Sequence, residues 1–258
     1  SGWTWSSAFV DVDLDGHDDL LLTNGHHYNA IDADTQMRLA NTQRAPVQNW
    51  RRSLLEYPSL DLHNVAFRNR GDGTFAAMPE GWGLGAEADV SHGMATGDLD
   101  RDGDLDVVVS RMNRPAGIYR SDAPGARLAV RLQGRGGNRR GIGAQVTVEA
   151  PGRPVQTEEM VSGGQYLSSS EAVATFGASA AGDTARVTVR WRSGAVSQVT
   201  GPANRIYEIE EPPAEASSAE ASPAKESAAS GGAFTRIALS GRQASSGPDG
   251  SAPNTSAP

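Results

Sequence analysis

The stretch DVDLDGHDDLLL, residues 11–22, places five aspartates within nine positions and then continues directly into leucines. Two carboxylates about 4 Å apart repel each other by roughly 4 kcal/mol at an effective dielectric constant of about 20. The same pattern returns in DLDRDGDLDVVV, residues 98–109. A repeated cluster of like charges beside an apolar run indicates that a bound cation offsets the repulsion.

The two stretches share one ligand spacing. Aspartate stands at loop positions 1, 3, 5 and 9, and glycine stands at position 6, where a tight turn needs a positive φ. Position 7 would offer a backbone carbonyl. Hard oxygen ligands in this number favour Ca²⁺ over Mg²⁺, which demands a tighter octahedral geometry. We therefore predict two Ca²⁺ sites, with the ligands Asp11, Asp13, Asp15, His17 and Asp19 in the first and Asp98, Asp100, Asp102, Asp104 and Asp106 in the second.

The loops differ from an EF-hand at position 12. An EF-hand has a bidentate glutamate there, whereas position 12 here is Leu22 in one loop and Val109 in the other. Each loop is therefore predicted to lead into a strand. A loop filled with protein oxygens leaves little open coordination for catalysis, so the ion is predicted to be structural. An acidic turn without an ion is disfavoured, because two loops share the same ligand and glycine positions.

Composition restricts the classes of function. The 258-residue chain contains no cysteine, which excludes disulfides, zinc–thiolate sites and thiol nucleophiles. Its net charge of −8 argues against nucleic acid as a partner. No apolar run approaches the length of a membrane span, and the obvious carboxylate pairs all belong to the aspartate loops. We therefore expect neither a membrane-spanning segment nor an enzyme, and the 30 glycines between short apolar runs favour an all-β protein.

The chain divides into three zones that differ in composition and hydrophobic pattern. Residues 1–120 hold both aspartate loops, with a polar insertion at about 26–62 that is predicted to be partly helical. Residues 121–211 show the alternation of half-buried strands. Residues 212–258 begin PPAEASSAEASPAKES and are predicted to be disordered, because this composition cannot bury enough apolar area to offset its ordering entropy.

Alternation with a period of two marks the strands of the middle zone. Three apolar sets define it, namely Leu128, Val130 and Leu132, then Val146 and Val148, then Val187, Val189 and Trp191. Arg127 and Arg131 alternate with the first set and are predicted to lie on its polar face. The segments 67–75 and 162–170 each have the composition of a hairpin, and the serines of the second are predicted to occupy a polar face.

These motifs resemble those of known families. DVDLDGHDD and DLDRDGDLD, together with NRGDGTF at residues 69–75, resemble FG-GAP/VCBS repeats, the Ca²⁺-carrying blades of integrin-type β-propellers. The sequences IGAQV, SGGQYLSSS and VRWRSG, within residues 138–209, resemble an ASPIC/UnbV domain. The order of the two is that of cartilage acidic protein-like proteins, which are widespread in bacteria.

The resemblance implies a fold class and a location. The expected fold is all-β: a partial integrin-type β-propeller of about two Ca²⁺-binding blades, followed by a small antiparallel β-sandwich-like ASPIC/UnbV domain and a disordered tail. A closed propeller typically needs four to eight blades, so the chain is expected to be truncated at its N-terminus. The family implies a secreted, periplasmic or cell-surface protein.

Binding is the function that these features favour. We expect a calcium-stabilised extracellular or envelope interaction module whose partner is a protein, a glycan or a matrix component. Two alternatives remain open, a non-catalytic part of a secreted hydrolase and a passive envelope scaffold. Aromatic residues could stack on sugars, although a place in the blade core is favoured for them; these residues are Trp3, Trp5, Trp50, Tyr57 and Trp82.

Overall fold

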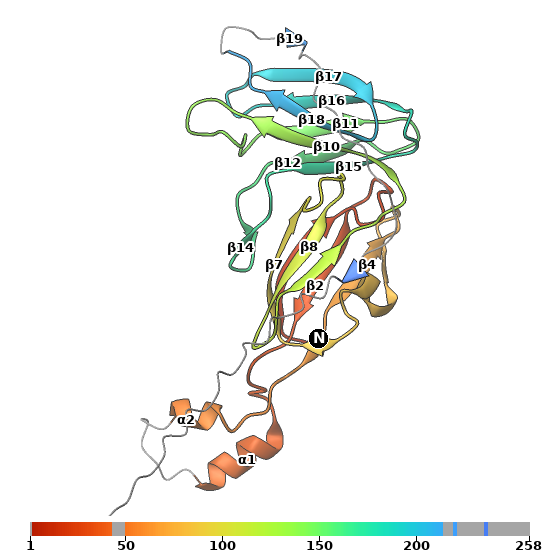
Figure 1. Ribbon diagram of the computed structural model, residues 1–258. Coiled ribbons are helices and arrows are strands. Elements are labelled where there is room, and N and C mark those ends of the chain that lie inside the picture. Colours follow the sequence, from red (N-terminus) through yellow and green to blue (C-terminus); the bar gives the residue numbers. More distant parts are fainter. Residues whose placement is uncertain (1, 43–49, 214–218, 221–234, 237–258) are drawn as a thin grey trace, which may run out of the picture.

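The computed structural model describes residues 2–42, 50–213, 219–220 and 235–236, and in this part of the chain the protein is all-β, as the sequence predicts. Two four-stranded sheets form one end of the molecule and a sandwich of two further sheets forms the other (Figure 1). No sheet closes into a barrel within the described residues. The four-stranded sheets therefore form an open pair of propeller-like blades.

The first blade is antiparallel throughout, in the order β1-β2-β4-β5. Its strands are β1 (Thr4–Val10), β2 (Asp19–Asn24), β4 (Val65–Asn69) and β5 (Phe75–Ala77). The hairpin predicted at 67–75 is the β4–β5 pair, closed by a backbone hydrogen bond from Arg70 to the carbonyl of Thr74. The first aspartate loop joins β1 to β2, so it enters a strand as predicted.

The second blade repeats this arrangement in the order β7-β8-β9-β20. Its strands are β7 (Ser91–Gly97), β8 (Asp106–Arg111), β9 (Gly117–Arg120) and β20 (Thr235–Arg236). The second aspartate loop joins β7 to β8. Apolar side chains of the two blades pack into a single core that includes Leu21, Met94, Val107 and Val109. The blades therefore stabilise each other through a shared interior.

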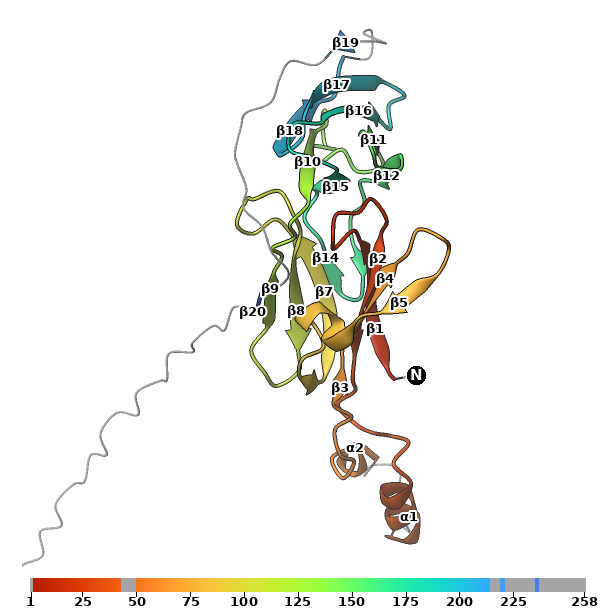
Figure 2. The same ribbon diagram turned by 90° about the vertical axis from the view of Figure 1, so that its right-hand side faces the viewer.

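The polar insertion between the loops is partly helical, as expected. It contains α1 (Ala33–Thr42) and α2 (Trp50–Leu54), and residues 43–49 between them lie outside the described residues. Both helices project from the end of the blades that faces away from the sandwich (Figures 1 and 2). Beyond them, β3 (Leu62–His63) pairs with β6 (Ala88–Asp89), and the 3₁₀ helix η2 spans Pro79–Gly83.

The sandwich encloses its own apolar core, which includes Phe176, Trp191 and Ile209. One sheet has the order β15-β10-β18 and the other has the order β12-β11-β16-β17-β19. The strands are β10 (Ala126–Gln133), β11 (Gln145–Glu149), β12 (Gln156–Glu159), β15 (Ala174–Ala178), β16 (Thr184–Arg190), β17 (Val196–Pro202), β18 (Arg205–Glu210) and β19 (Ala219–Glu220). The pairing is antiparallel as predicted, except that β10–β18 and β17–β19 are parallel.

Strand β10 departs from the predicted alternation. Leu128, Ala129 and Val130 are all fully buried, and Arg127, predicted to lie on a polar face, is only 4 % exposed. The prediction for Arg127 was wrong because β10 lies between the sandwich core and the blades, so both of its faces are covered. The Arg127 guanidinium is directed at the second aspartate loop, where it forms an ion pair with Asp102.

A hairpin of β13 (Gly164–Gln165) and β14 (Ser168–Ser169) confirms the prediction for 162–170. It extends from the sandwich and lies against the blades beside β7 (Figures 1 and 2). The Ser168 hydroxyl donates to the carbonyl of Met94 at 2.5 Å, and the Ser170 hydroxyl accepts from the Thr96 amide at 3.0 Å. These hydroxyls thus bind blade backbone and help to hold the two parts of the molecule together.

Two short strands interrupt the zone predicted to be disordered. Strand β19 pairs in parallel with β17, and β20 pairs in antiparallel fashion with β9. Backbone pairing at an open sheet edge needs no apolar side chains, which is why composition does not reveal it. The remainder of the tail, from residue 214 onward, lies outside the described residues. In the described part, neither helix has the length and apolar character needed to cross a membrane.

Candidate metal centre

The two aspartate loops have the same backbone conformation. Gly16 and Gly103, at position 6, have φ values of 93° and 94°, as the sequence predicts. Position 4 is also left-handed, with φ of 56° at Leu14 and 65° at Arg101. Two non-glycine residues with positive φ at equivalent positions indicate that the surrounding structure enforces this conformation in both loops.

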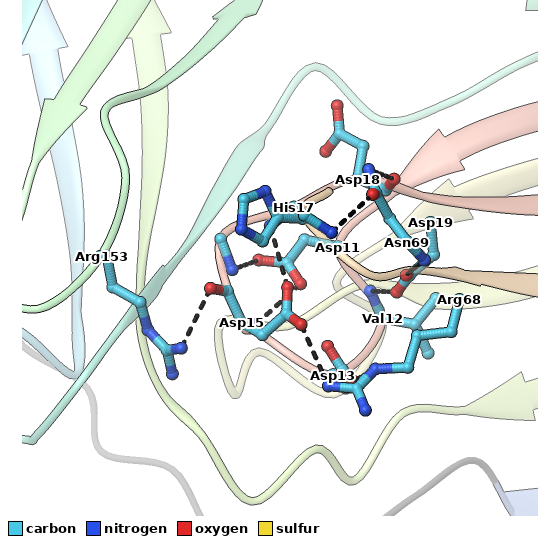
Figure 3. A network of polar contacts seen from close by, with 12 residues as sticks. Asp11, Val12, Asp13, Asp15, His17, Asp18, Asp19, Arg68, Asn69 and Arg153 are labelled. Carbon is cyan, nitrogen blue, oxygen red and sulfur yellow. Dashed lines mark hydrogen bonds and ion pairs between the residues drawn. The ribbon is translucent and has the colours of Figure 1, made fainter. Parts of the chain in front are cut away.

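Side-chain to backbone hydrogen bonds repeat in the same register. The Asp11 carboxylate accepts from the amides of Asp15 at 2.9 Å and Gly16 at 2.8 Å (Figure 3). In the second loop, the Asp98 carboxylate accepts from the amide of Asp102 at 2.9 Å. The aspartate at position 1 therefore organises each loop around its own carboxylate, and the rest of the loop curls towards it.

Each loop gathers three carboxylates into a possible chelating group. One oxygen each from Asp11, Asp13 and Asp15 lies within 4.8 Å of the other two, and Asp98, Asp100 and Asp102 form a second such set. Several oxygens in the two loops are buried without accepting a hydrogen bond, namely Asp13 Oδ1, Asp98 Oδ2 and both carboxylate oxygens of Asp104. Buried acceptors without donors are costly, so the residues present fit a hard divalent cation.

The aspartates at position 9 have a different environment from the other predicted ligands. Asp19 accepts from the amides of Val12 at 3.0 Å and Asn69 at 2.8 Å, one at each carboxylate oxygen. Asp106 accepts from the amides of Leu99 at 2.9 Å and Ser121 at 2.8 Å. Each residue thereby links the start of its loop to the end of a neighbouring strand. Any role as ligands would have to use the remaining lone pairs.

Asp18 is the remaining aspartate of the first loop, and it lies apart from the carboxylate cluster (Figure 3). Figure 3 shows the Asp18 carboxylate pointing away from Asp11, Asp13 and Asp15. At position 7, the His17 amide donates to Asp15 at 3.0 Å, and the equivalent Asp104 amide donates to Asp102 at 3.2 Å. Position 7 thus closes the turn in both loops.

Arginines from outside the loops face both carboxylate clusters. Arg68 forms ion pairs with Asp13 at 2.6 Å and Asp15 at 3.0 Å. Arg127 lies 2.7 Å from Asp102 and 3.4 Å from Asp104, and Arg131 lies 3.5 Å from Asp98. Local sequence patterns do not connect any of these arginines with the loops, because they lie on strands distant in the sequence.

The sandwich contacts the first loop as well. Arg153 donates to the carbonyl of Asp15 at 3.0 Å. A Cβ atom on Gly177 would lie 2.4 Å from the carbonyl oxygen of Leu14, so only glycine permits this approach of strand β15. Leu14 itself is buried. Both aspartate loops therefore lie at the junction between the blades and the sandwich, and each is in contact with the sandwich.

Burial shifts the acidity of the loops upwards. It raises the pKa of Asp11 to about 7, with Asp15 adding to the rise against the opposing hydrogen bonds of the Gly16 and Asp15 amides. The pKa of Asp19 is raised to about 7 mainly by burial, and that of Asp104 is raised to about 7 by burial despite the opposing charge of Arg127. In the absence of a cation these carboxylates resist ionisation. Binding of a cation would therefore be strongly favoured at this site.

These shifts predict how stability depends on pH in calcium-free buffer. An aspartate whose folded pKa lies above its unfolded value of about 3.9 binds more protons when folded, so its stabilisation is present at low pH and is lost as pH rises. Ionisation of these aspartates should therefore lower Tm progressively between pH 5 and pH 8; the residues concerned are Asp11, Asp19 and Asp104. At 5 mM CaCl₂ the fall should disappear, because a bound cation keeps the carboxylates ionised. A calcium-free Tm that rises over this range would contradict the assignment.

The aromatic residues are divided between core and surface. The Trp5 ring stacks on His26 at 5.6 Å and packs against His92 at 4.4 Å and Tyr166 at 4.9 Å, so it is part of an aromatic cluster. Trp82 packs against the blade core, whereas Trp3 is 42 % exposed. Tyr57 is half-buried in the insertion, and the side chain of Trp50 lies outside what the structure describes. The expectation of blade core is therefore met by Trp82 and not by Trp3, whereas Trp5 lies in the aromatic cluster.

The fold and the two loops define a class of protein in which β-blades with aspartate-rich loops precede a β-sandwich. Family models agree with this class. The model described as an FG-GAP-like repeat matches residues 59–109, and the model described as ASPIC and UnbV matches residues 134–216. The chain thus contains an FG-GAP-like repeat and an ASPIC/UnbV domain, which confirms the resemblance. The cartilage acidic protein-like subfamily stays a prediction, and a search of curated proteins finds no significant match.

Proposed function

We propose that this protein is a calcium-stabilised binding module that acts outside the cytoplasm, in a secreted, periplasmic or cell-surface setting. The observation that carries the proposal is the matched pair of aspartate loops at the junction of the two domains. Each loop has the same three-carboxylate cluster and the same turn geometry. In this proposal the cation joins the blades to the ASPIC/UnbV domain and takes no part in chemistry.

Calcium is the cation that the donor set favours. Asp11, Asp13 and Asp15 would hold it in the first loop, and Asp98, Asp100 and Asp102 would do so in the second. A bound ion would neutralise charge and supply a partner for the buried carboxylate oxygens. The donors are hard carboxylate oxygens supplied at the spacing of a calcium loop, which suits Ca²⁺ better than Mg²⁺.

The location follows from the affinity that such loops usually have. Extracellular calcium modules have dissociation constants of about 10⁻⁴–10⁻³ M, which are useful only where the ion is abundant. FG-GAP-like and ASPIC/UnbV domains support the same setting. The partner in this proposal is a protein or a glycan, and neither a nucleic acid partner nor an enzymatic activity is proposed.

Binding experiments separate this proposal from its two alternatives. The 258-residue chain should bind members of a glycan array or a panel of matrix proteins, and a chelator should abolish the signal. The Asp100→Ala/Asp102→Ala variant should lose binding in proportion to its loss of calcium. Turnover of generic ester or glycoside substrates would favour a hydrolase instead. Absence of both binding and turnover would favour a passive envelope scaffold.

A further inference from the structure

A cavity of about 300 Å³ lies at the boundary between the blades and the ASPIC/UnbV domain. Phe9 and Asp18 line it from the blade side, and Glu158, Val161 and Gln165 line it from the other side. None of the three-carboxylate chelating groups contributes a residue to its lining. The cavity lies beside the aspartate loops, and clefts between structural units are common positions for ligand sites.

Glu158 occupies a position where the fold would ordinarily place an apolar residue. It lies on the edge strand β12, directly opposite Val146 of β11. Residues directly opposite each other in an antiparallel pair share a face of the sheet, and Val146 belongs to the sandwich core. The register therefore directs an acidic side chain towards the apolar side of the sheet, at the edge where the cavity opens.

Nothing in the described structure compensates this carboxyl. Glu158 is half-buried, and desolvation raises its pKa to about 8, with Asp18 and Asp11 adding to the rise. Within the described residues, no ion pair or hydrogen bond to its side chain occurs. A carboxyl partly withdrawn from water, with no cation and no donor beside it, is costly to keep, and such groups are concentrated at functional sites.

Two more side chains bring acceptor oxygens to the cavity. Gln165 Oε1 is buried and accepts no hydrogen bond. The exposed Asp18 carboxylate points away from its own loop (Figure 3) and lines the cavity. Glu158, Asp18 and Gln165 together present acceptors, so a complementary ligand must bring both positive charge and N–H donors.

Exposed apolar side chains at the same cavity indicate that the rest of the ligand is apolar. Phe9 is 65 % exposed and Val161 is 57 % exposed, although both are large apolar residues. A methylene stem can pack on such side chains while its charged head reaches the carboxylates. An aromatic ring such as that of Phe9 can also attract a cation. A lysine or arginine side chain combines these properties, whereas a bare metal ion would leave the apolar surface uncovered.

We propose that this cleft binds a lysine or arginine side chain of a partner protein. Glu158 and Asp18 supply the countercharge, Gln165 accepts a hydrogen bond, and Phe9 and Val161 cover the stem. The proposal rests on the proposed function as a binding module, and it selects a protein with an exposed basic residue as the partner. The proposal does not alter the structural role proposed for a cation at the aspartate loops.

A peptide titration tests the proposal with calcium held at 5 mM. The probe is acetyl-Gly-Lys-Gly-amide, and binding is followed by amide chemical shifts of the 258-residue chain. The lysine peptide should shift resonances of residues 157–165 and Phe9. A peptide with Nε-acetyl-lysine in its place should bind at least ten-fold more weakly. Equal binding of the two peptides, or no binding of the lysine peptide, would overturn the proposal.

Two variants with the same loss of charge make the test specific. Glu158→Gln keeps the shape of the side chain and should weaken lysine-peptide binding at least ten-fold. Glu208→Gln, on the exposed face of β18 and outside the cavity, should leave binding unchanged. An unaltered affinity in Glu158→Gln would refute the assignment. A lower calcium stoichiometry in Glu158→Gln would instead assign this carboxyl to the metal centre and overturn the proposal.

The outcomes for this cleft and for the proposed function are separable. A calcium-dependent rise in Tm without binding of the lysine peptide would contradict the cleft proposal and leave the proposed function standing. Lysine binding that persists in a protein with no response to calcium would support the cleft and count against the calcium module.

Discussion

Addition of 5 mM CaCl₂ to calcium-free protein is expected to raise Tm strongly. A dissociation constant of about 10⁻⁴ M gives roughly 2 kcal/mol of stabilisation per site by mass action, and a chain of this size converts that into about 4–8 °C per site. Each ion would also relieve the mutual repulsion of Asp98, Asp100 and Asp102, or of their equivalents in the first loop. Differential scanning calorimetry in calcium and in chelator measures the effect.

Paired variants show whether the rise belongs to the loops. Asp100→Ala/Asp102→Ala should reduce the calcium-induced rise to about half, because one loop remains. Asp13→Ala/Asp15→Ala added to it should abolish the rise. The control double variant, Asp61→Ala/Asp72→Ala, removes two exposed aspartates outside the loops and should keep the full rise. An unchanged melting curve on adding calcium to the unsubstituted protein would refute the metal assignment.

Substitution of Arg127 should have the second largest effect. Its buried guanidinium pairs with Asp102 and Asp104 and donates to the carbonyls of Asp102 and Ala123. Removing one partner of a buried ion pair typically costs about 3–5 kcal/mol, because an uncompensated charge is left behind. Arg127→Met should therefore lower the free energy of unfolding in chelator by about 3 kcal/mol, measured by urea denaturation.

Calcium should recover part of this loss. A cation bound among Asp98, Asp100 and Asp102 would compensate the charge that Arg127 leaves unpaired, so calcium should stabilise the variant by more than it stabilises the unsubstituted protein. The control is Arg186→Met, which breaks an exposed pair with Glu149 and should change stability by less than about 1 kcal/mol. Equal calcium stabilisation with and without Arg127 would show that this arginine and the second loop are not coupled.

Local patterns were sufficient to predict most elements. The hairpin at 67–75 follows from its turn residues, and the alternation of Val146 and Val148 places β11 correctly. The aspartate loops are equally local, since a possible chelating set at positions 1, 3 and 5 and a glycine at position 6 lie within six residues. A loop that closes on itself can be inferred from the sequence because all of its parts are neighbours.

Long-range partners could not be inferred in the same way. Arg127 alternates with apolar residues and therefore has the pattern of a surface arginine, yet the blades cover it. Glu158 lies in a polar stretch, and only the pairing with Val146 shows that it faces the apolar side of the sheet. The docking of the 164–169 hairpin beside β7 has no signal in either segment.

Hydrophobic period, turn chemistry and ligand spacing act over a few residues, and they were enough to establish the all-β class, the two aspartate loops and the order of the two domains. The folded chain was needed to place both loops at a domain junction, to bring arginines against them, and to open a cleft with an uncompensated carboxyl beside them. These features depend on side chains that are distant in the chain meeting in space, as Arg127 and Asp102 do at a separation of 25 residues and Arg68 and Asp15 do at 53. Burial and charge at such meetings are set by the packing of whole sheets.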